Sequence, residues 1–110
     1  MGVDPRWRAL RGRLAREDQI ATAVASSAVV LLGDDVAVAI AWDPAREPVP
    51  RRTATGERAR ATQLVALGRR YQLPIHRDPA LAAALAGATG PVPAAHWPLL
   101  AEIVAATRRP

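Results

Sequence analysis

The sequence contains no cysteine, no phenylalanine and no lysine, and it has only one tyrosine and three tryptophans. Without cysteine the chain cannot form a disulfide, use a thiolate as a nucleophile or build a cysteine-type zinc site. Without phenylalanine the interior has to be built from smaller side chains, and 25 alanines together with many valines and leucines supply them. Such side chains let helices and strands approach closely, so we expect a tightly packed interior.

The absence of lysine means that all fifteen basic residues are arginine. Five arginines precede residue 20, and eight more lie between Arg46 and Arg77, while the net charge of the chain is only +5. Arginine clusters are typical of nucleic-acid-binding proteins. The clusters here have no interleaved aromatic pair that could stack on bases, and no zinc-finger or RNP-like motif. A basic nucleic-acid-binding module is therefore an alternative interpretation that rests on charge alone.

Long apolar runs are also missing, and none approaches the roughly 20 residues that a membrane-spanning helix needs. The first residues carry spaced arginines, which a secretory signal peptide does not have. We therefore expect a cytoplasmic protein that reaches a membrane only through a partner. A length of 110 residues, half of them hydrophobic, fits one compact domain.

Two short apolar segments, 28–32 and 36–42, predict neighbouring strands separated by a turn. In the second strand the larger side chains share one face, namely Val36, Val38, Ile40 and Trp42, and the alanines at 37, 39 and 41 share the other. Neither face is polar, so helices have to cover both faces.

The remaining pattern completes an α/β arrangement. Residues 5–19 predict a helix with Trp7, Leu10 and Leu14 on one side, and 20–27 predict a joint. After the two strands the pattern predicts, in order, an exposed strand at 51–55, a helix capped by Thr55 and Gly56, a strand at 73–76, a helix capped by Asp78, a turn at 87–91 and a last helix from Pro93. The fold class is α/β, with a small four-stranded, mostly central sheet flanked by about four helices. We expect residues 1–27 to form a basic helix and linker, and 28–110 to form the α/β domain.

Catalytic motifs are not apparent. The two histidines, His76 and His96, have no carboxylate at the spacing of a metal site. Asp34 and Asp35 follow a strand, where paired carboxylates could hold a magnesium ion, but Gly-Asp-Asp is also an ordinary hairpin turn. We favour the turn and predict no catalytic residue, no metal, no cofactor and no small-molecule substrate. A metal-dependent enzyme built on the two aspartates is a second alternative.

Five segments occur in a recognisable order. An apolar strand leads to Leu32-Gly33-Asp34-Asp35 and then to a strand that ends in Trp42-Asp43-Pro44, and later segments lie at 50–56, 73–76, 78–85 and 92–103. This order resembles the cytoplasmic domain of the type III secretion export-apparatus switch protein, which serves bacterial flagella (as FlhB) and injectisomes. The resemblance covers residues 26–106 and implies a small α/β fold. The family's membrane domain has no counterpart in the sequence, so we expect a stand-alone domain.

The turn departs from the family. Leu32, Gly33, Asp34 and Asp35 stand where the family has Asn, Pro, Thr and His. In the family the asparagine amide attacks its own backbone carbonyl, and the chain breaks before the proline. Leucine has no nucleophile, so the resemblance implies a degenerate autocleavage motif and a chain that stays whole.

The resemblance also implies a function through protein contact, with export substrates or other export-apparatus components as partners and a role in substrate recognition or specificity switching. The family is thought to offer export substrates a small apolar depression, and the matching positions here are Val49, Pro50, Ala101 and Val104. Ala101 and Val104 lie one turn apart on the last helix and can border one spot. They also share the apolar stripe of that helix, so packing inside the domain is the competing interpretation. Flagellar and injectisome roles are both open.

Overall fold

The computed structural model describes residues 19–108, which form one mixed sheet between two layers of helices. The strands are β1 (Val29–Leu32), β2 (Val36–Ala41), β3 (Arg51–Glu57), β4 (Ile75–Arg77) and β5 (Gly90–Pro91). Their order across the sheet is β4-β1-β2-β3-β5. Only the pair of β1 and β4 is parallel. The predicted α/β class is confirmed.

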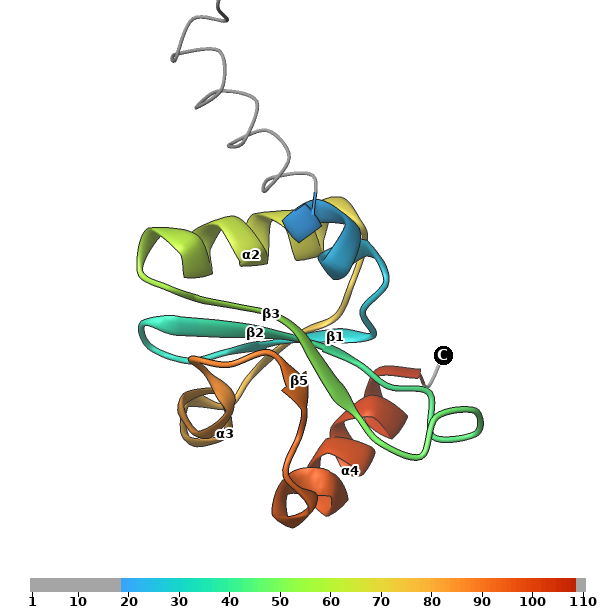
Figure 1. Ribbon diagram of the computed structural model, residues 1–110. Helices are drawn as coiled ribbons and strands as arrows, with labels where there is room; N and C mark the ends of the chain where they lie inside the picture. Colours follow the sequence, from blue (N-terminus) through green and yellow to red (C-terminus); the bar gives the residue numbers. More distant parts are fainter. Residues whose placement is uncertain (1–18, 109–110) are drawn as a thin grey trace, which may run out of the picture.

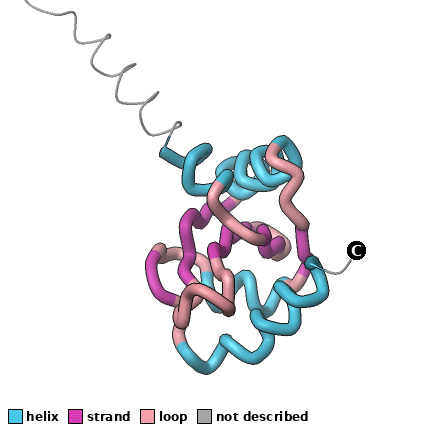
Figure 2. The backbone as a smooth tube through the Cα atoms, turned by 90° about the vertical axis from the view of Figure 1, so that its right-hand side faces the viewer, coloured by secondary structure: helices cyan, strands magenta, loops and turns pink. Residues whose placement is uncertain are grey.

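The helices lie on both faces of this sheet. They are a helix over 19–25, α2 (Ala59–Arg70), α3 (Pro79–Leu85), a 3₁₀ turn (Ala94–His96) and α4 (Trp97–Arg108). α2 covers one face, and α3 and α4 cover the other (Figure 1). The side view shows the strands between these two helical layers (Figure 2).

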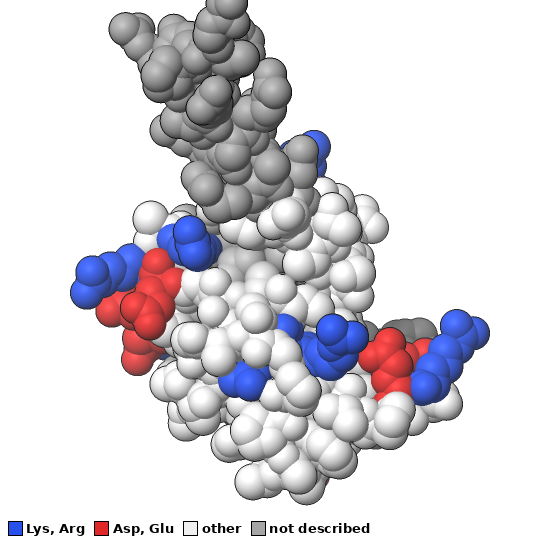
Figure 3. Space-filling model, in the orientation of Figure 1, with Lys and Arg blue, Asp and Glu red and all other residues white. Residues whose placement is uncertain are grey.

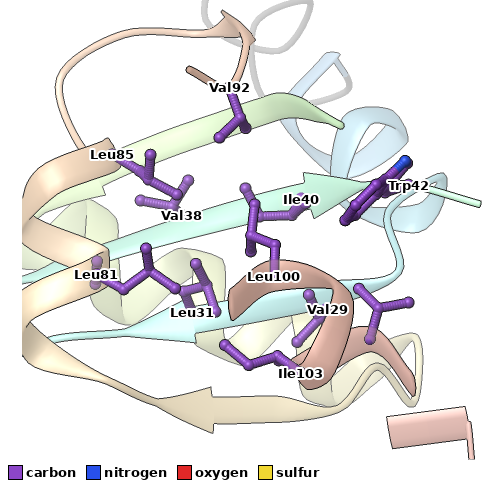
Figure 4. Close-up of a cluster of buried hydrophobic side chains, with 12 residues drawn as sticks. Val29, Leu31, Val38, Ile40, Trp42, Leu81, Leu85, Val92, Leu100 and Ile103 are labelled. Atoms are coloured by element: carbon purple, nitrogen blue, oxygen red, sulfur yellow. The ribbon is translucent and has the colours of Figure 1, made fainter. Parts of the chain in front are cut away.

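The alternation predicted for β2 is what separates the two halves of the core. Val38 and Ile40 are fully buried in the cluster that β1 and β2 form with α3 and α4 (Figure 4). Ala37 and Ala39 are equally buried, but they belong to the cluster under α2. The small side chains on that face let α2 pack closely. A Cβ added at Gly68 of α2 would lie only 3.0 Å from Cγ2 of Val30.

The sheet has five strands, so the four-stranded prediction is wrong in that detail. The fifth strand, β5, lies within the turn predicted at 87–91 and contains only Gly90 and Pro91. Two kinds of bond align this segment with β3. The Val92 N–H donates to the Pro50 carbonyl at 3.0 Å, and the Arg52 guanidinium donates to the carbonyl groups of Leu85, Gly90 and Pro91. A two-residue strand has no periodicity of its own, so no sequence pattern indicates it.

Several helix and strand boundaries also differ from the predicted ones. β3 continues to Glu57, so Thr55 and Gly56 belong to the strand and do not cap α2. Instead, Arg58 precedes α2 with a φ of 53° and no capping side chain. β2 ends at Ala41, before Trp42. The predicted cap at Asp78 is confirmed, because its carboxylate accepts the Leu81 N–H at 3.1 Å.

The segment 20–27 was predicted as a joint, but it is helical as far as residue 25. Val24 on this helix is fully buried in the same cluster as Leu64 of α2, and the Ser27 hydroxyl donates to the Ala23 carbonyl at 2.7 Å. Most of the helix predicted at 5–19, with Trp7, Leu10 and Leu14, lies outside the described residues. Within 19–108, no helix combines the length and the apolar character that crossing a membrane requires.

Candidate functional site

The first candidate site is the turn between β1 and β2, where the resemblance places the degenerate autocleavage motif. The Gly33 N–H donates to the Val36 carbonyl at 2.8 Å, which closes a hairpin with Asp34 and Asp35 exposed at its tip. A proline at position 33 would have no N–H to donate. This hairpin therefore depends on a bond that an Asn-Pro sequence at 32 and 33 could not make.

Leu32 and Gly33 are held firmly at the base of the turn. The Leu32 carbonyl accepts the Asp78 N–H at 3.0 Å, and its side chain packs partly buried against the cluster under α2. Gly33 is buried, and a Cβ added there would lie 2.9 Å from Cγ2 of Val36 and 3.3 Å from Cβ of Ala82. A larger residue at position 33 would therefore require the Val36 side chain to move and α3 to give way slightly.

The two aspartates at the tip make different interactions. The Asp34 carboxylate accepts a hydrogen bond from the Arg77 guanidinium at 2.6 Å, and both side chains are largely exposed. Asp35 offers its backbone carbonyl to the Arg58 N–H at 2.8 Å. Both aspartates line a pocket of about 420 Å³ that extends along α2 to Arg69. Across residues 19–108, no three histidine, aspartate or glutamate side chains gather closely enough to hold a metal ion.

The second candidate site is the apolar patch predicted from Val49, Pro50, Ala101 and Val104. Pro50 is buried, and Val104 is only 1% exposed because it belongs to the cluster between the sheet and α4. Val49 and Ala101 are partly exposed. The two exposed members are therefore the ones that a partner could reach.

Val92 links the two halves of this patch. Its N–H bonds to the Pro50 carbonyl, its side chain packs in the same cluster as Val104, and its carbonyl accepts the Trp97 indole N–H at 2.8 Å. Sequence reasoning did not identify Val92 or Arg52 as structural neighbours of the patch. The sequence placed Trp97 on the apolar stripe of the last helix, but it did not indicate the hydrogen bond from the Trp97 indole to the Val92 carbonyl.

Charge is distributed unevenly over the surface. Residues 79–101, which include α3, β5 and the first part of α4, contain no Asp, Glu, Lys or Arg. In Figure 3 the lower part of the visible face, over α3 and α4, is correspondingly uncharged. Arginines and acidic residues lie next to each other across the middle of that face (Figure 3). The described surface thus has an uncharged region beside a region of mixed charge.

The described domain is thus a central sheet covered by helices on both faces, with a tight hairpin between its first two strands. The model of the FlhB HrpN YscU SpaS family matches residues 3–107, and the chain belongs to this family. The resemblance found in the sequence is thereby confirmed.

Solved structures show the same fold. A mutated EscU C-terminal domain superimposes with a TM-score of 0.80 at 19% identity, over 89% of this chain and 94% of that one. The cytoplasmic domain of FlhB from Shewanella putrefaciens gives a TM-score of 0.72 at 22% identity, over 81% of this chain and 71% of that one. A comparison with curated proteins finds none that matches.

Proposed function

We propose that this chain serves type III protein export as a non-cleaving relative of the switch-protein cytoplasmic domain, and that it acts in the cytoplasm by contact with other proteins. Family membership over residues 3–107 is the observation that carries the proposal. Its partners are export substrates or other export-apparatus components, and its role is in substrate recognition or specificity switching. The domain was expected to begin at residue 28, but Val24 on the helix over 19–25 is buried in its core, so the working domain includes this helix.

The chemistry at the turn supports the non-cleaving part of the proposal. Autocleavage in the family needs an asparagine amide, whereas Leu32 offers only carbon and hydrogen. The Asp34 carboxylate is engaged with Arg77 and stands two residues beyond the bond that would break. The domain therefore works as one unbroken chain and not as an enzyme.

The proposed contact surface includes Val49 and Ala101. Both belong to the patch that matches the family's substrate-binding depression, and both keep part of their surface exposed. Ala101 lies on α4 and is the last residue of the uncharged segment 79–101. An uncharged surface suits a protein partner, because no charged group has to lose its hydration there.

A nucleic-acid role is less well supported by the arrangement of the arginines. Arg77 forms an ion pair with Asp34, and Nε of Arg46 lies 3.9 Å from a carboxylate oxygen of Asp43. The Arg52 guanidinium donates hydrogen bonds to three backbone carbonyl groups. A nucleic-acid interface usually presents its basic side chains together on one face. We therefore keep protein contact as the proposed mode of action.

The test is capture of partners from native cytoplasm with the tagged full chain, followed by mass spectrometry. We expect type III export components or export substrates to be enriched, and their identity decides between a flagellum and an injectisome. Ala101→Glu places a charge on the proposed surface and is expected to reduce capture. Ala106→Glu introduces the same charge at an exposed position of α4 and is the matched control.

Two results would contradict the proposal. One is an unchanged set of captured proteins with Ala101→Glu, which would exclude the patch. The other is retention of the chain on duplex or single-stranded nucleic acid at physiological salt, with a steep loss of retention as salt rises. That second result would favour the nucleic-acid-binding module instead.

A further inference from the structure

The outer edge of β3 is covered by another strand over less than half of its length. β5 pairs only with Arg51 and Arg52, through Pro91 and Gly90. From Thr53 to Glu57, β3 has β2 on its inner side, and no strand among residues 19–108 lies on its outer side. An open strand edge presents unpaired N–H and C=O groups that another strand can bond.

The alternation of hydrogen bonds along β3 identifies which of its backbone N–H and C=O groups point away from β2. The Arg58 N–H donates to the Asp35 carbonyl at 2.8 Å, at the end of the antiparallel ladder between β2 and β3. Hydrogen-bonded and non-hydrogen-bonded residues alternate in such a ladder, so Gly56 and Ala54 also bond toward β2. Thr55 and Glu57 therefore direct their backbone N–H and C=O groups away from the sheet, where an added strand would lie.

A groove runs beside this edge on the side of α2. Its volume is about 360 Å³, and Thr53, Ala54 and Thr55 form one wall. Ile20, Ala23 and Leu64 supply an apolar lining, and Thr89 lies near the start of β5. The side chains along this part of β3 are small, so a second backbone can come within hydrogen-bonding distance. One apolar side chain of a bound peptide would have room in the groove.

Arg60 gives the groove its charge. It lines the groove from the first turn of α2 and is exposed. Within the described part of the chain its guanidinium has no ion-pair or hydrogen-bond partner. A carboxylate on a bound segment would have a free partner there, whereas an ammonium group would be repelled.

We propose that the edge of β3 from Thr53 to Glu57 binds an extended segment of a protein partner as a sixth strand. The segment bonds through its backbone to Thr55 and Glu57. It places an apolar side chain over Ile20, Ala23 and Leu64, and a carboxylate beside Arg60. This mode of binding by strand addition derives its affinity from main-chain bonds and its specificity from alternate side chains. The edge does not include the patch of Val49 and Ala101, so it is a separate contact surface that goes beyond the function proposed above.

The probe is a capped pentapeptide of sequence Glu-Thr-Val-Thr-Glu, which reads the same in both directions. Either orientation along β3 puts valine over the groove and a carboxylate toward Arg60. We expect saturable shifts of the Thr55 and Glu57 amide signals in proton–nitrogen correlation spectra of the full chain, and slower hydrogen exchange at Thr55. A peptide with lysine in place of both glutamates is expected to bind about tenfold more weakly or worse.

A charge reversal provides the matched control. Arg60→Glu should bind the lysine peptide in preference to the glutamate peptide, and Arg70→Glu, at the far end of α2, should keep the original preference. The glutamate peptide with every backbone nitrogen methylated should not bind, because it cannot donate to the edge. The peptide variants leave the protein unaltered, so they test the edge even if a substitution disturbs folding.

Three outcomes would overturn the proposal. The first is the absence of shifts at Thr55 and Glu57 up to millimolar peptide. The second is equal binding of the methylated peptide, since the contact would then not be a strand addition. The third is a change of these amide signals with protein concentration alone, which would show that a second copy of the chain occupies the edge.

Discussion

At position 32 the chain carries a hydrocarbon side chain, and the resemblance places the asparagine of the family's autocleavage motif at this position. The neighbouring residues stabilise the turn through hydrogen bonds. The Gly33 N–H closes the hairpin by bonding to the Val36 carbonyl, and the Asp34 carboxylate bonds to Arg77. Each of these interactions holds the turn together and none activates a nucleophile. At the scale of single residues, the turn is built for structural integrity.

The purified protein is therefore expected to remain one chain during prolonged incubation at neutral pH. Intact-mass measurement over time checks this, with a cleaving member of the family as the positive control. Two fragments whose masses place the break between Leu32 and Gly33 would contradict the chemical argument, since no side-chain amide is available at that bond.

The N-terminus of helix α3 is capped by a single side chain, that of Asp78. The Asp78 carboxylate accepts the Leu81 N–H, and Pro79 occupies the first helical position. Asp78→Ala removes the acceptor and is expected to lower the free energy of unfolding by about 0.5–2 kcal/mol. Urea denaturation measures the change. Asp35→Ala, at the exposed tip of the hairpin, is the control and should have a much smaller effect.

The contact between α2 and the sheet depends on the small side chains of β2. Ala39 has no exposed surface and lies beneath α2 with Leu64 and Ala61. Ala39→Leu adds three carbon atoms where no space exists and is expected to cost about 1–3 kcal/mol. The denaturation midpoint reports the loss, with Ala66→Leu on the exposed side of α2 as the control. An unchanged midpoint for Ala39→Leu would mean that α2 does not cover this face.

For the whole molecule, the sheet is stable only if both of its apolar faces stay covered. α4 supplies Leu100, Ile103 and Val104 to the face that α2 does not reach, together with residues from α3 (Figure 4). Val104 therefore packs inside the domain, although the sequence-based prediction grouped it with Val49 and Ala101 in one patch. A substitution at Val104 can distinguish a role in folding from a role in partner binding.

Val104→Asp is expected to cost about 3–5 kcal/mol, because it buries a carboxylate without a partner. Such a loss is comparable with the whole stability of a small domain, so the thermal transition should be lowered strongly or disappear. Ala105→Asp places the same charge at an exposed position and should leave the transition nearly unchanged. If Val104→Asp kept its melting temperature and lost only partner binding, Val104 would be a contact residue.

Local patterns in the sequence were sufficient for much of this architecture. The alternation in 36–42 predicted a strand buried on both faces, and Asp78 followed by Pro79 predicted the start of α3. Both features depend on residues close together in the chain, so the pattern itself contains the physical cause. The chemistry expected at Leu32 also follows from the residue alone, and the non-cleaving behaviour stays a prediction until it is measured.

Other features depend on contacts between residues far apart in the chain, and only the tertiary structure decided them. β5 exists because Arg52 and Pro50 bond to a segment about 40 residues later. The same long-range packing buries Pro50 and Val104 and leaves Val49 and Ala101 partly exposed, a distinction that a shared apolar stripe cannot make. The open edge of β3 arises for a related reason, because the length of one strand and the shortness of its neighbour become visible only when the two are paired. Sequence patterns specify which faces are apolar, whereas the packing of distant segments decides which of those faces and edges stay accessible.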